Sequence, residues 1–208
     1  RLKLGHLRGL NERSRQMRIS WSQPFALTCT VTESAGIPSF NSANLSAIVA
    51  AVNGVAAGAG ASFVMACDIA IAAPTASFIQ AFSKIGLIPD SGGTFTLPRL
   101  IGFQKASALM MLGDKVSATD AERMNMIYKV FADDVFADEV KKLAANLAAM
   151  PTKGLALTKC ALNRTYINNL DQQLALEDEL QTQAGQTYDY NEGVQAFLEK
   201  RKPDFKGE

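Results

Sequence analysis

The feature that most constrains the fold is a stretch of small and apolar residues at positions 47–73. It begins with an apolar run over residues 47–55 that only Asn53-Gly54 interrupts. A continuous apolar run that ends in a tight turn is typical of a parallel strand buried on both faces. The first part of the stretch therefore predicts a buried strand at Ala47–Val55.

A helix and further strands follow the first strand. Gly58–Gly60 opens an apolar segment, Ala61–Cys67, that is long enough for two helical turns. Asp68–Ala73 has the composition of the next strand, and Ser77–Gln80 is a candidate for one more. Strand, helix and strand in this order form a βαβ unit with a right-handed crossover. The sequence therefore predicts an α/β core with a parallel sheet.

Beyond Pro89 the pattern changes to helices. Ser117 and Asp120 have the spacing of a capping box, and Asn125 stands where a helix ends in the left-handed conformation. One β-branched segment, Ile127–Phe131, predicts an isolated strand. We expect helices at 92–101, 103–112, 117–125, 134–149, 152–167, 170–187 and 189–200.

Residues 1–46 differ in composition from the rest. They carry six basic and two acidic residues, whereas residues 47–208 carry 15 basic and 18 acidic ones. Apart from a possible strand at Phe25–Val31, they show no regular apolar period, so we expect an arm that contributes little to stability. A basic arm could bind nucleic acid, but its many Ser and Thr residues are equally typical of a loosely packed segment.

The composition of the whole chain argues against several classes of function. A formal net charge of +1 gives no broad attraction to nucleic acid or to anionic membranes. No apolar run approaches the roughly 20 residues that a spanning helix needs. The three cysteines are far apart, and we find no signal-peptide core, so we expect a cytoplasmic protein with reduced thiols.

The glycines after the first strand are one candidate site. Backbone amides at Gly58, Ala59 and Gly60 would be unpaired at a strand-to-helix junction, where they could hold a phosphate or a developing oxyanion. Alternatively, small residues merely allow the helix to approach the sheet. No lysine follows Gly60, which excludes the common phosphate-loop pattern.

Asp90 is the second candidate. It stands in a turn rich in Pro and Gly, where it could cap the following helix. It could instead be a proton-transfer group if Phe82, Leu87, Ile88 and Phe95 surround it, because an apolar environment raises the pKa of a carboxyl group. Periodicity alone leaves both interpretations open.

Three segments resemble the enoyl-CoA hydratase/isomerase, or crotonase, superfamily. Residues 50–72 read AAVNGVAAGAGASFVMACDIAIA, residues 82–113 read FSKIGLIPDSGGTFTLPRLIGFQKASALMMLG, and residues 192–208 read EGVQAFLEKRKPDFKGE. The resemblance covers about 160 of the 208 residues, from Ala47 onward. It implies an α/β core of ββα units over residues 47–131 and a helical oligomerisation region over residues 132–208. Residues 1–46 are then an atypical basic N-terminal segment.

The resemblance also implies an oxyanion hole made of two backbone amides. One of them falls at Ala59, between Gly58 and Gly60. In the family the other belongs to an N-terminal loop that we do not find in residues 1–46. This departure keeps open the alternative of a catalytically impaired, acyl-CoA-binding scaffold, and a nucleic-acid-binding member is a further alternative.

The resemblance implies isomerase chemistry through the acidic residue Asp90. The hydratases of the family place two glutamates at the positions of Ser62 and Phe82, which cannot transfer protons. The isomerase branch places an acidic residue at the position of Asp90, which would move protons beside the thioester carbonyl. The expected reactions are a double-bond shift or the rearrangement of 1,2-epoxyphenylacetyl-CoA, with Phe82 and Ile88 next to the acyl group.

The C-terminal signature implies a contact with coenzyme A. Phe197 and Lys200 fall where family members contact the coenzyme A of a neighbouring subunit. The alternative is an ordinary solvated helix end, because residues 199–202 are all charged. The resemblance implies a homotrimer or hexamer, with no metal and no cofactor other than the coenzyme A of the substrate.

Overall fold

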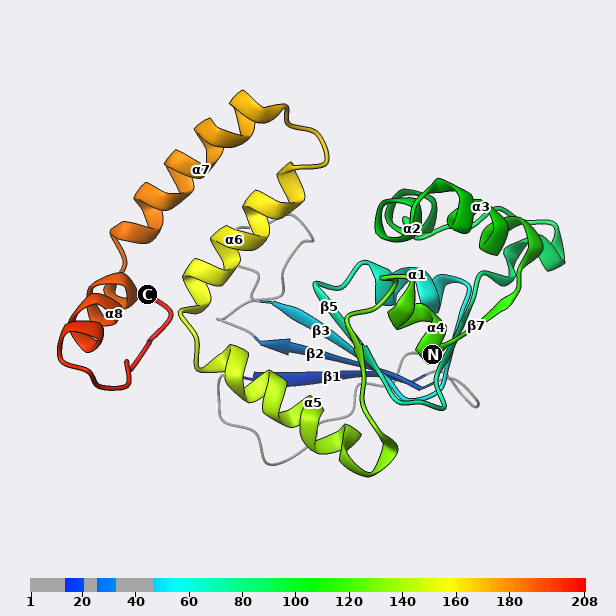
Figure 1. Cartoon of the computed structure of the whole chain (residues 1–208), viewed down its shortest axis with the longest axis horizontal. Coiled ribbons are helices and arrows are strands. Elements are labelled where there is room, and N and C mark those ends of the chain that lie inside the picture. The colour runs from blue at the N-terminus through cyan, green and yellow to red at the C-terminus, as the bar shows by residue number, and fades with distance from the viewer. Residues whose placement is uncertain (1–13, 21–25, 33–46) are drawn as a thin grey trace. The chain divides into compact units, whose positions relative to one another are not determined.

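The computed structural model describes residues 14–20, 26–32 and 47–208 (Figure 1). These residues form two compact units. The first contains most of the two N-terminal strands together with residues 48–142, and the second contains residues 143–208.

The first unit is built around a five-stranded sheet with the order β1-β2-β3-β5-β8. Strands β3, β5 and β8 are parallel, and Val49 of β3 pairs with Ile69 of β5. The residues of β3 after Ile48 are all buried, which explains its uninterrupted apolar sequence. The strands span β1 (Ser14–Ser20), β2 (Ala26–Thr32), β3 (Ile48–Val52), β5 (Ile69–Ala72) and β8 (Lys129–Val130).

The N-terminal strands bear on the expectation for residues 1–46. The possible strand at Phe25–Val31 is confirmed as β2, but β1 has no counterpart in the sequence prediction. Both strands extend the sheet beyond β3, so β3 is an internal strand. This pairing argues against the expectation that residues 1–46 contribute little to stability, which stays a prediction for a deletion experiment.

A second sheet has the order β4-β6-β7. It consists of β4 (Val55–Ala57), β6 (Ser77–Ile79) and β7 (Lys115–Ser117), with β4 parallel to β6 and β7 antiparallel to β6. The single strand expected at Ala47–Val55 is therefore two strands in two sheets. Asn53 and Gly54 connect the two strands. They form a turn after β3, and the chain then continues as β4 in the other sheet.

Two pairs of strands are each followed by a helix, as expected for ββα units. Strands β3 and β4 precede α1 (Ala59–Met65), and β5 and β6 precede the short 3-10 helix η1 (Ala81–Ile85) and then α2 (Gly93–Ile101). The α/β class and the ββα repeat are confirmed. The repeat brings the N-terminus of α1 and the loop before α2 into the same unit.

The expected helices are present, and their ends differ from the prediction by no more than three residues. The Ser117 side chain accepts a hydrogen bond from the Asp120 amide, and Asn125 has φ 62, as the sequence predicts. The remaining helices are α3 (Phe103–Leu112), α4 (Ala118–Arg123), α5 (Asp133–Ala148), α6 (Thr152–Arg164), α7 (Leu170–Gly185) and α8 (Tyr188–Leu198).

In the second unit, α6 and α7 lie side by side (Figure 1). The Asn169 side chain accepts from the amide of Gln172, and the Gln172 side chain accepts from the amide of Asn169. This capping box explains why α7 begins at Leu170, because two otherwise unpaired amides are satisfied. Gln173 also donates to the Ala161 carbonyl and joins the two helices.

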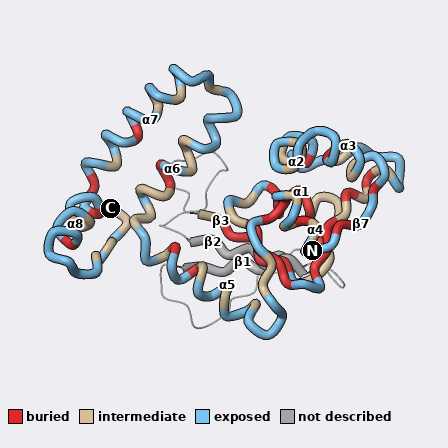
Figure 2. The backbone as a smooth tube through the Cα atoms, in the orientation of Figure 1, coloured by how far each residue is buried: buried red, intermediate tan, exposed pale blue. Residues whose placement is uncertain are grey.

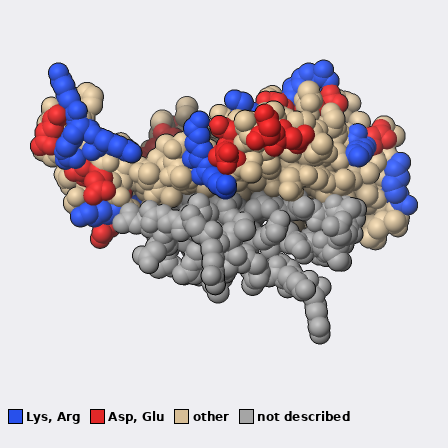
Figure 3. Space-filling model, turned by 90° about the horizontal axis from the view of Figure 1, so that it is seen from below, with Lys and Arg blue, Asp and Glu red and all other residues tan. Residues whose placement is uncertain are grey.

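Buried residues concentrate in the strands and in α1 of the first unit (Figure 2). The core is made largely of alanine and valine around Phe78 and Leu97, which allows strands and helices to approach closely. Within the described residues no helix is long and apolar enough to cross a membrane. Figure 3 shows basic and acidic side chains interspersed over the described part of one face.

Candidate functional site

The N-terminus of α1 offers backbone amides. Gly58 precedes the helix with φ 54, a left-handed value that favours glycine, and its amide donates to the Ile79 carbonyl at 2.9 Å. Ala59, Gly60 and Ala61 are the first three residues of the helix, so their amides have no acceptor within it. Ala59 therefore has a backbone amide without an acceptor inside α1, as the sequence predicts.

Phe82 covers the glycine before this helix. A Cβ atom on Gly58 would lie 3.5 Å from Cζ of Phe82, so the aromatic ring rests against the glycine. Phe82 is buried. The structure thus brings together the predicted site residues Gly58 and Phe82 and places an apolar ring beside the amides of α1.

Helix α2 approaches α1 at Gly93. A Cβ atom on Gly93 would lie 2.6 Å from Oγ of Ser62 and 3.7 Å from Cβ of Pro89. Ser62 is fully buried, and its hydroxyl faces the Gly58 carbonyl at 3.5 Å. Since the Gly93 amide donates to the Asp90 carbonyl, the approach of Gly93 to Ser62 packs the turn that begins at Asp90 against α1.

Asp90 begins a tight turn. The Gly93 amide donates to the Asp90 carbonyl at 2.9 Å, and Ser91 and Gly92 have φ 52 and φ 78. These are the features of a type I′ turn, which rarely contains serine at its first central position. The Asp90 carboxylate accepts a hydrogen bond from the Ser91 hydroxyl at 3.0 Å.

The helix-cap interpretation of Asp90 is wrong. Helix α2 begins at Gly93, and its N-cap is Gly92, with no side-chain hydrogen bond to the cap. Asp90 stands two residues before that cap. Its carboxylate is not used to start the helix and is available for other chemistry.

The structure also departs from the expected environment of Asp90. Asp90 is exposed, and Leu87, Ile88 and Phe95 are 58%, 81% and 42% exposed. Of the four expected apolar neighbours, only Phe82 is buried. The condition under which these four side chains would desolvate the carboxylate is therefore not met in the chain by itself, because three of the four are exposed.

Phe197 and Lys200 belong to the second unit. Phe197 is in the last turn of α8 and is 82% exposed. Lys200 follows the helix with φ 55, and its amide donates to the Phe197 carbonyl at 3.3 Å. The Arg201 amide donates to the Ala196 carbonyl at 3.0 Å, which completes a Schellman motif with lysine at the position that glycine usually occupies.

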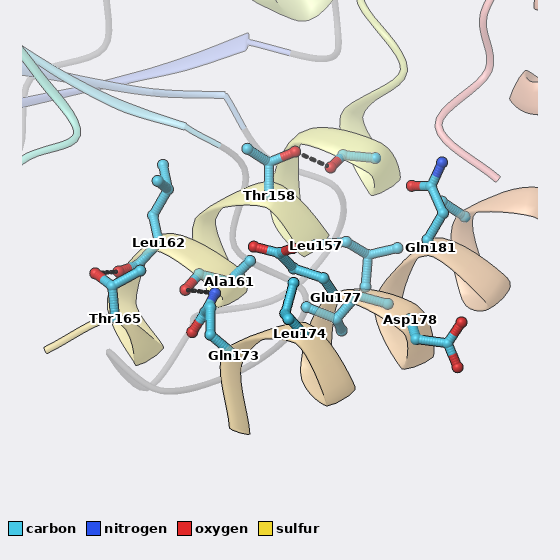
Figure 4. A pocket seen from close by; sticks show the side chains of 13 residues that line it. Leu157, Thr158, Ala161, Leu162, Thr165, Gln173, Leu174, Glu177, Asp178 and Gln181 are labelled. Atoms are coloured by element: carbon cyan, nitrogen blue, oxygen red, sulfur yellow. Dashed lines mark hydrogen bonds between the residues drawn. The ribbon is translucent and has the colours of Figure 1, made fainter. Parts of the chain in front are cut away.

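The second unit also contains a groove of about 660 Å³ between α6 and α7 (Figure 4). Three of its polar side chains bond to nearby carbonyls: Thr158 donates to that of Gly154, Thr165 to that of Leu162 and Gln173 to that of Ala161. None of the predicted site residues lines it. Its apolar lining comes from Leu157, Ala161, Leu162, Leu174, Leu180 and Ala184.

Sequence reasoning missed two structural features at these sites. One is the close approach of Gly93 to Ser62, which the pair of glycines at 92–93 indicates only weakly. The other is a set of charged residues behind Lys200, in which Glu192 binds Arg201. The available signal was the motif itself, since Glu192 and Arg201 both belong to the closing segment EGVQAFLEKRKPDFKGE.

Comparisons with known proteins agree with this architecture. A family model described as enoyl-CoA hydratase/isomerase matches residues 42–208. The chain is 51% identical over 160 residues to 1,2-epoxyphenylacetyl-CoA isomerase of Escherichia coli, covering 77% of this chain and 61% of that protein. It is 47% identical over 160 residues to a protein of Rhodobacter capsulatus named "Probable enoyl-CoA hydratase", covering 77% of this chain and 62% of the relative.

A solved structure of this family is also similar to the chain in fold. The enoyl-CoA hydratase from Polaromonas sp. JS666 has a TM-score of 0.72 and 37% sequence identity, over 76% of this chain and 62% of that one. The chain thus spans about three-fifths of the length of the curated relatives it matches. These relatives carry both isomerase and hydratase names.

Proposed function

Because the chain belongs to the enoyl-CoA hydratase/isomerase family, we propose that it is an acyl-CoA isomerase. Its substrates would be thioesters that undergo a double-bond shift or, as the name of the Escherichia coli relative suggests, the rearrangement of 1,2-epoxyphenylacetyl-CoA. Phenylacetate breakdown is the corresponding metabolic context. The observation that carries the proposal is the turn that begins at Asp90: its last residue, Gly93, packs against Ser62 of α1, and the Asp90 carboxylate has no capping role.

The proposed mechanism uses one carboxylate and a backbone donor. Asp90 removes a proton from a carbon near the thioester and returns it at another carbon. The charge that develops on the thioester oxygen is stabilised by the Ala59 amide, which has no acceptor within α1. Loss of one oxyanion donor costs about 3–4 kcal/mol of transition-state stabilisation.

Isomerisation is favoured over hydration by the two buried positions next to the site. Ser62 is fully buried, and Phe82 is 8% exposed. Neither side chain can act as a general base toward water at neutral pH, whereas hydration needs a group that activates the water molecule. The hydratase names among the relatives are therefore less consistent with these residues than the isomerase name.

One alternative is an acyl-CoA-binding scaffold that is catalytically impaired. It is favoured by the exposure of Asp90, since the described residues do not shield its carboxylate from bulk water. It is also favoured by the length of the chain, which spans about three-fifths of its curated relatives. A scaffold would bind acyl-CoA and catalyse neither reaction.

We also propose that the chain assembles as a homotrimer or hexamer through its helical region. Leu162 and Leu174 line the groove between α6 and α7 and are 63% and 54% exposed, and Leu170 nearby is 72% exposed. Burying such side chains between copies would contribute about 25 cal/mol for each Å² of apolar surface removed from water. Sedimentation should show an oligomer at micromolar concentration, and a monomer would contradict the proposal.

The variant Asp90→Asn tests the proposed chemistry. Asparagine has nearly the same shape but no basic carboxylate, so the isomerisation rate should fall by roughly 10²–10⁴-fold, the usual contribution of a positioned general base. Acyl-CoA affinity and melting temperature should change little. A variant that retains more than about a tenth of the rate would show that another group transfers the proton.

A further inference from the structure

The segment after α8 folds back onto the helix that precedes it. Asp189, in the first turn of α8, is only 3% exposed and accepts hydrogen bonds from two amides of this segment. The donors are the Lys206 amide at 2.6 Å and the Gly207 amide at 2.8 Å. The Asp189 amide in turn donates to the Glu208 carbonyl. The far end of the segment is thereby fixed to the start of α8.

Glu192, one turn later on α8, fixes the near end. It accepts two hydrogen bonds from the Arg201 guanidinium, at 2.5 and 2.9 Å, and one from the Asp204 amide at 2.8 Å. Its side chain is 10% exposed. The hydrogen bond from Arg201, followed by that from the Asp204 amide, lowers the pKa of Glu192 to about 2, so this carboxylate stays charged at every physiological pH.

Lys200 stands between α8 and this anchored arginine. Its φ of 55 is a conformation that residues with a side chain rarely adopt, and the Schellman motif in which it stands usually has glycine there. Such a residue keeps this conformation only where its surroundings impose it. Arg201 is the next residue, and its three contacts with α8 and Glu192 impose the conformation.

We propose that Glu192 is a positioning residue for coenzyme A binding, which acts by holding Lys200 in its left-handed turn through Arg201. The inference rests on the proposed function, in which the substrate is an acyl-CoA. Lys200 is the residue for which the family resemblance implies a contact with coenzyme A, whose anionic groups are its phosphates. Lysine binds phosphate as a point charge on a flexible stem, and the backbone at its Cα sets the direction from which that stem leaves the turn. The hydrogen bonds of Glu192 go to Arg201 and to the Asp204 amide, so it acts through the turn.

The test compares two thioesters that differ only in the nucleotide. Butyryl-CoA has no double bond to move, and butyryl-pantetheine lacks the phosphates and the adenine. Isothermal titration of the full chain should give Glu192→Ala an affinity for butyryl-CoA about tenfold weaker than the unmodified chain, the usual effect of losing one charge-assisted contact. Its affinity for butyryl-pantetheine should stay within about twofold of the unmodified chain.

Two further variants guard against a simple loss of folding. Glu192→Gln keeps the shape of the side chain and should give a smaller weakening in the same direction. Glu199→Ala removes the second carboxylate that binds Arg201, whose side chain is 56% exposed, and should leave both affinities within about twofold. An equal loss in Glu199→Ala would overturn the specific role of Glu192.

A double-mutant cycle separates positioning from general stability. Lys200→Gly removes the ammonium group while it keeps, and relaxes, the left-handed turn. If Glu192 acts through Lys200, then Glu192→Ala should not weaken butyryl-CoA binding further in the Lys200→Gly background. An additional loss of similar size there would mean that Glu192 has a merely structural role and would overturn the inference.

The outcomes also separate this inference from the proposed function. If the unmodified chain binds neither thioester, the proposed function fails and the inference fails with it. If the unmodified chain binds butyryl-CoA but Glu192→Ala binds it equally well, the positioning role is wrong while the proposed function stands. Parallel losses for butyryl-CoA and butyryl-pantetheine in Glu192→Ala would likewise contradict a role directed at the nucleotide.

Discussion

Two turns of the molecule hold a residue other than glycine in a left-handed conformation, and they do so with different contacts. They are the Asp90 turn, residues 90–93, and the Lys200 turn, residues 199–201 at the end of α8. Each contains a residue other than glycine with positive φ, Ser91 at 52 and Lys200 at 55. Asn125 is the one other such residue in the described part of the chain, and asparagine tolerates this conformation. Unfavourable backbone conformations therefore occur at two of the three places where the sequence predicts substrate contacts.

The difference lies in what holds each turn. The Asp90 turn is closed by one backbone hydrogen bond and by the packing of Gly93 against Ser62, and its carboxylate stays exposed. The Lys200 turn is closed by two backbone hydrogen bonds and by the Glu192–Arg201 pair. The Asp90 carboxylate at the first turn is thus available for chemistry, whereas the Glu192 carboxylate at the second turn holds the backbone through Arg201.

Two strands that are far from both turns in the sequence extend the central sheet of the first unit. Deleting residues 1–46 removes β1 and β2 and leaves β3 as an edge strand, so the melting temperature should fall by more than about 10 °C, equivalent to several kcal/mol. Thermal unfolding followed by circular dichroism measures this. A fall of less than about 3 °C would mean that the Asp90 turn needs no support from these strands.

Gly93→Ala tests whether packing holds the Asp90 turn. The new Cβ atom would lie 2.6 Å from the buried Ser62 hydroxyl, and overpacking of this kind typically costs about 1–3 kcal/mol. The second variant Ser62→Ala removes that oxygen and should restore most of the lost stability, because Cβ of Ser62 would be 3.5 Å away. Chemical denaturation of the two single variants and the double variant gives the result, and a missing rescue would contradict the contact.

Acidification tests the holding role of Glu192. Since folding lowers the pKa of Glu192 from 4.5 to about 2, its stabilising contribution is complete above about pH 4.5 and is lost as the pH falls toward 2. The melting temperature should therefore fall more steeply between pH 5 and 2 in the unmodified chain than in Glu192→Gln. Calorimetry at several pH values measures the slopes, and equal slopes would show that Glu192 is not an anchor.

Ser91→Gly should have the smallest effect. Glycine adopts positive φ without the clash of a Cβ atom, which favours the variant by up to about 1 kcal/mol, although the hydrogen bond from Ser91 to Asp90 is lost. We expect the melting temperature to rise by about 2–4 °C. Destabilisation instead would show that the Ser91 hydroxyl, and not the backbone hydrogen bond, holds this turn.

The sequence predicted the parts of the fold that local patterns control. The helix ends around Ser117 and Asn125 follow from capping chemistry, and the buried strands follow from uninterrupted apolar runs. Strand β1 could not be predicted, because its polar sequence SRQMRIS is extended by pairing within the sheet and not by its own pattern. The division of residues 47–55 into β3 and β4 likewise depends on two sheets that only the folded chain forms.

At the candidate site, too, local sequence patterns predict only part of the structure. Its residue types follow from the motif, but the exposure of Asp90 depends on how the loop before α2 turns Leu87 and Ile88 outward. The hold on Lys200 depends on Glu192, which is eight positions earlier and reaches Arg201 only because the segment after α8 folds back. Such contacts join residues that no local pattern connects.

The central claim is that one carboxylate serves isomerisation where a hydratase would need two. The most direct measurement follows the full chain with a 3-enoyl-CoA and with crotonyl-CoA, separating the products by chromatography. We expect the chain to convert the 3-enoyl-CoA to the conjugated 2-enoyl-CoA. We expect no 3-hydroxyacyl-CoA above background from crotonyl-CoA, because Ser62 and Phe82 cannot activate water. Hydration of crotonyl-CoA at a rate equal to or above the isomerisation rate would contradict it.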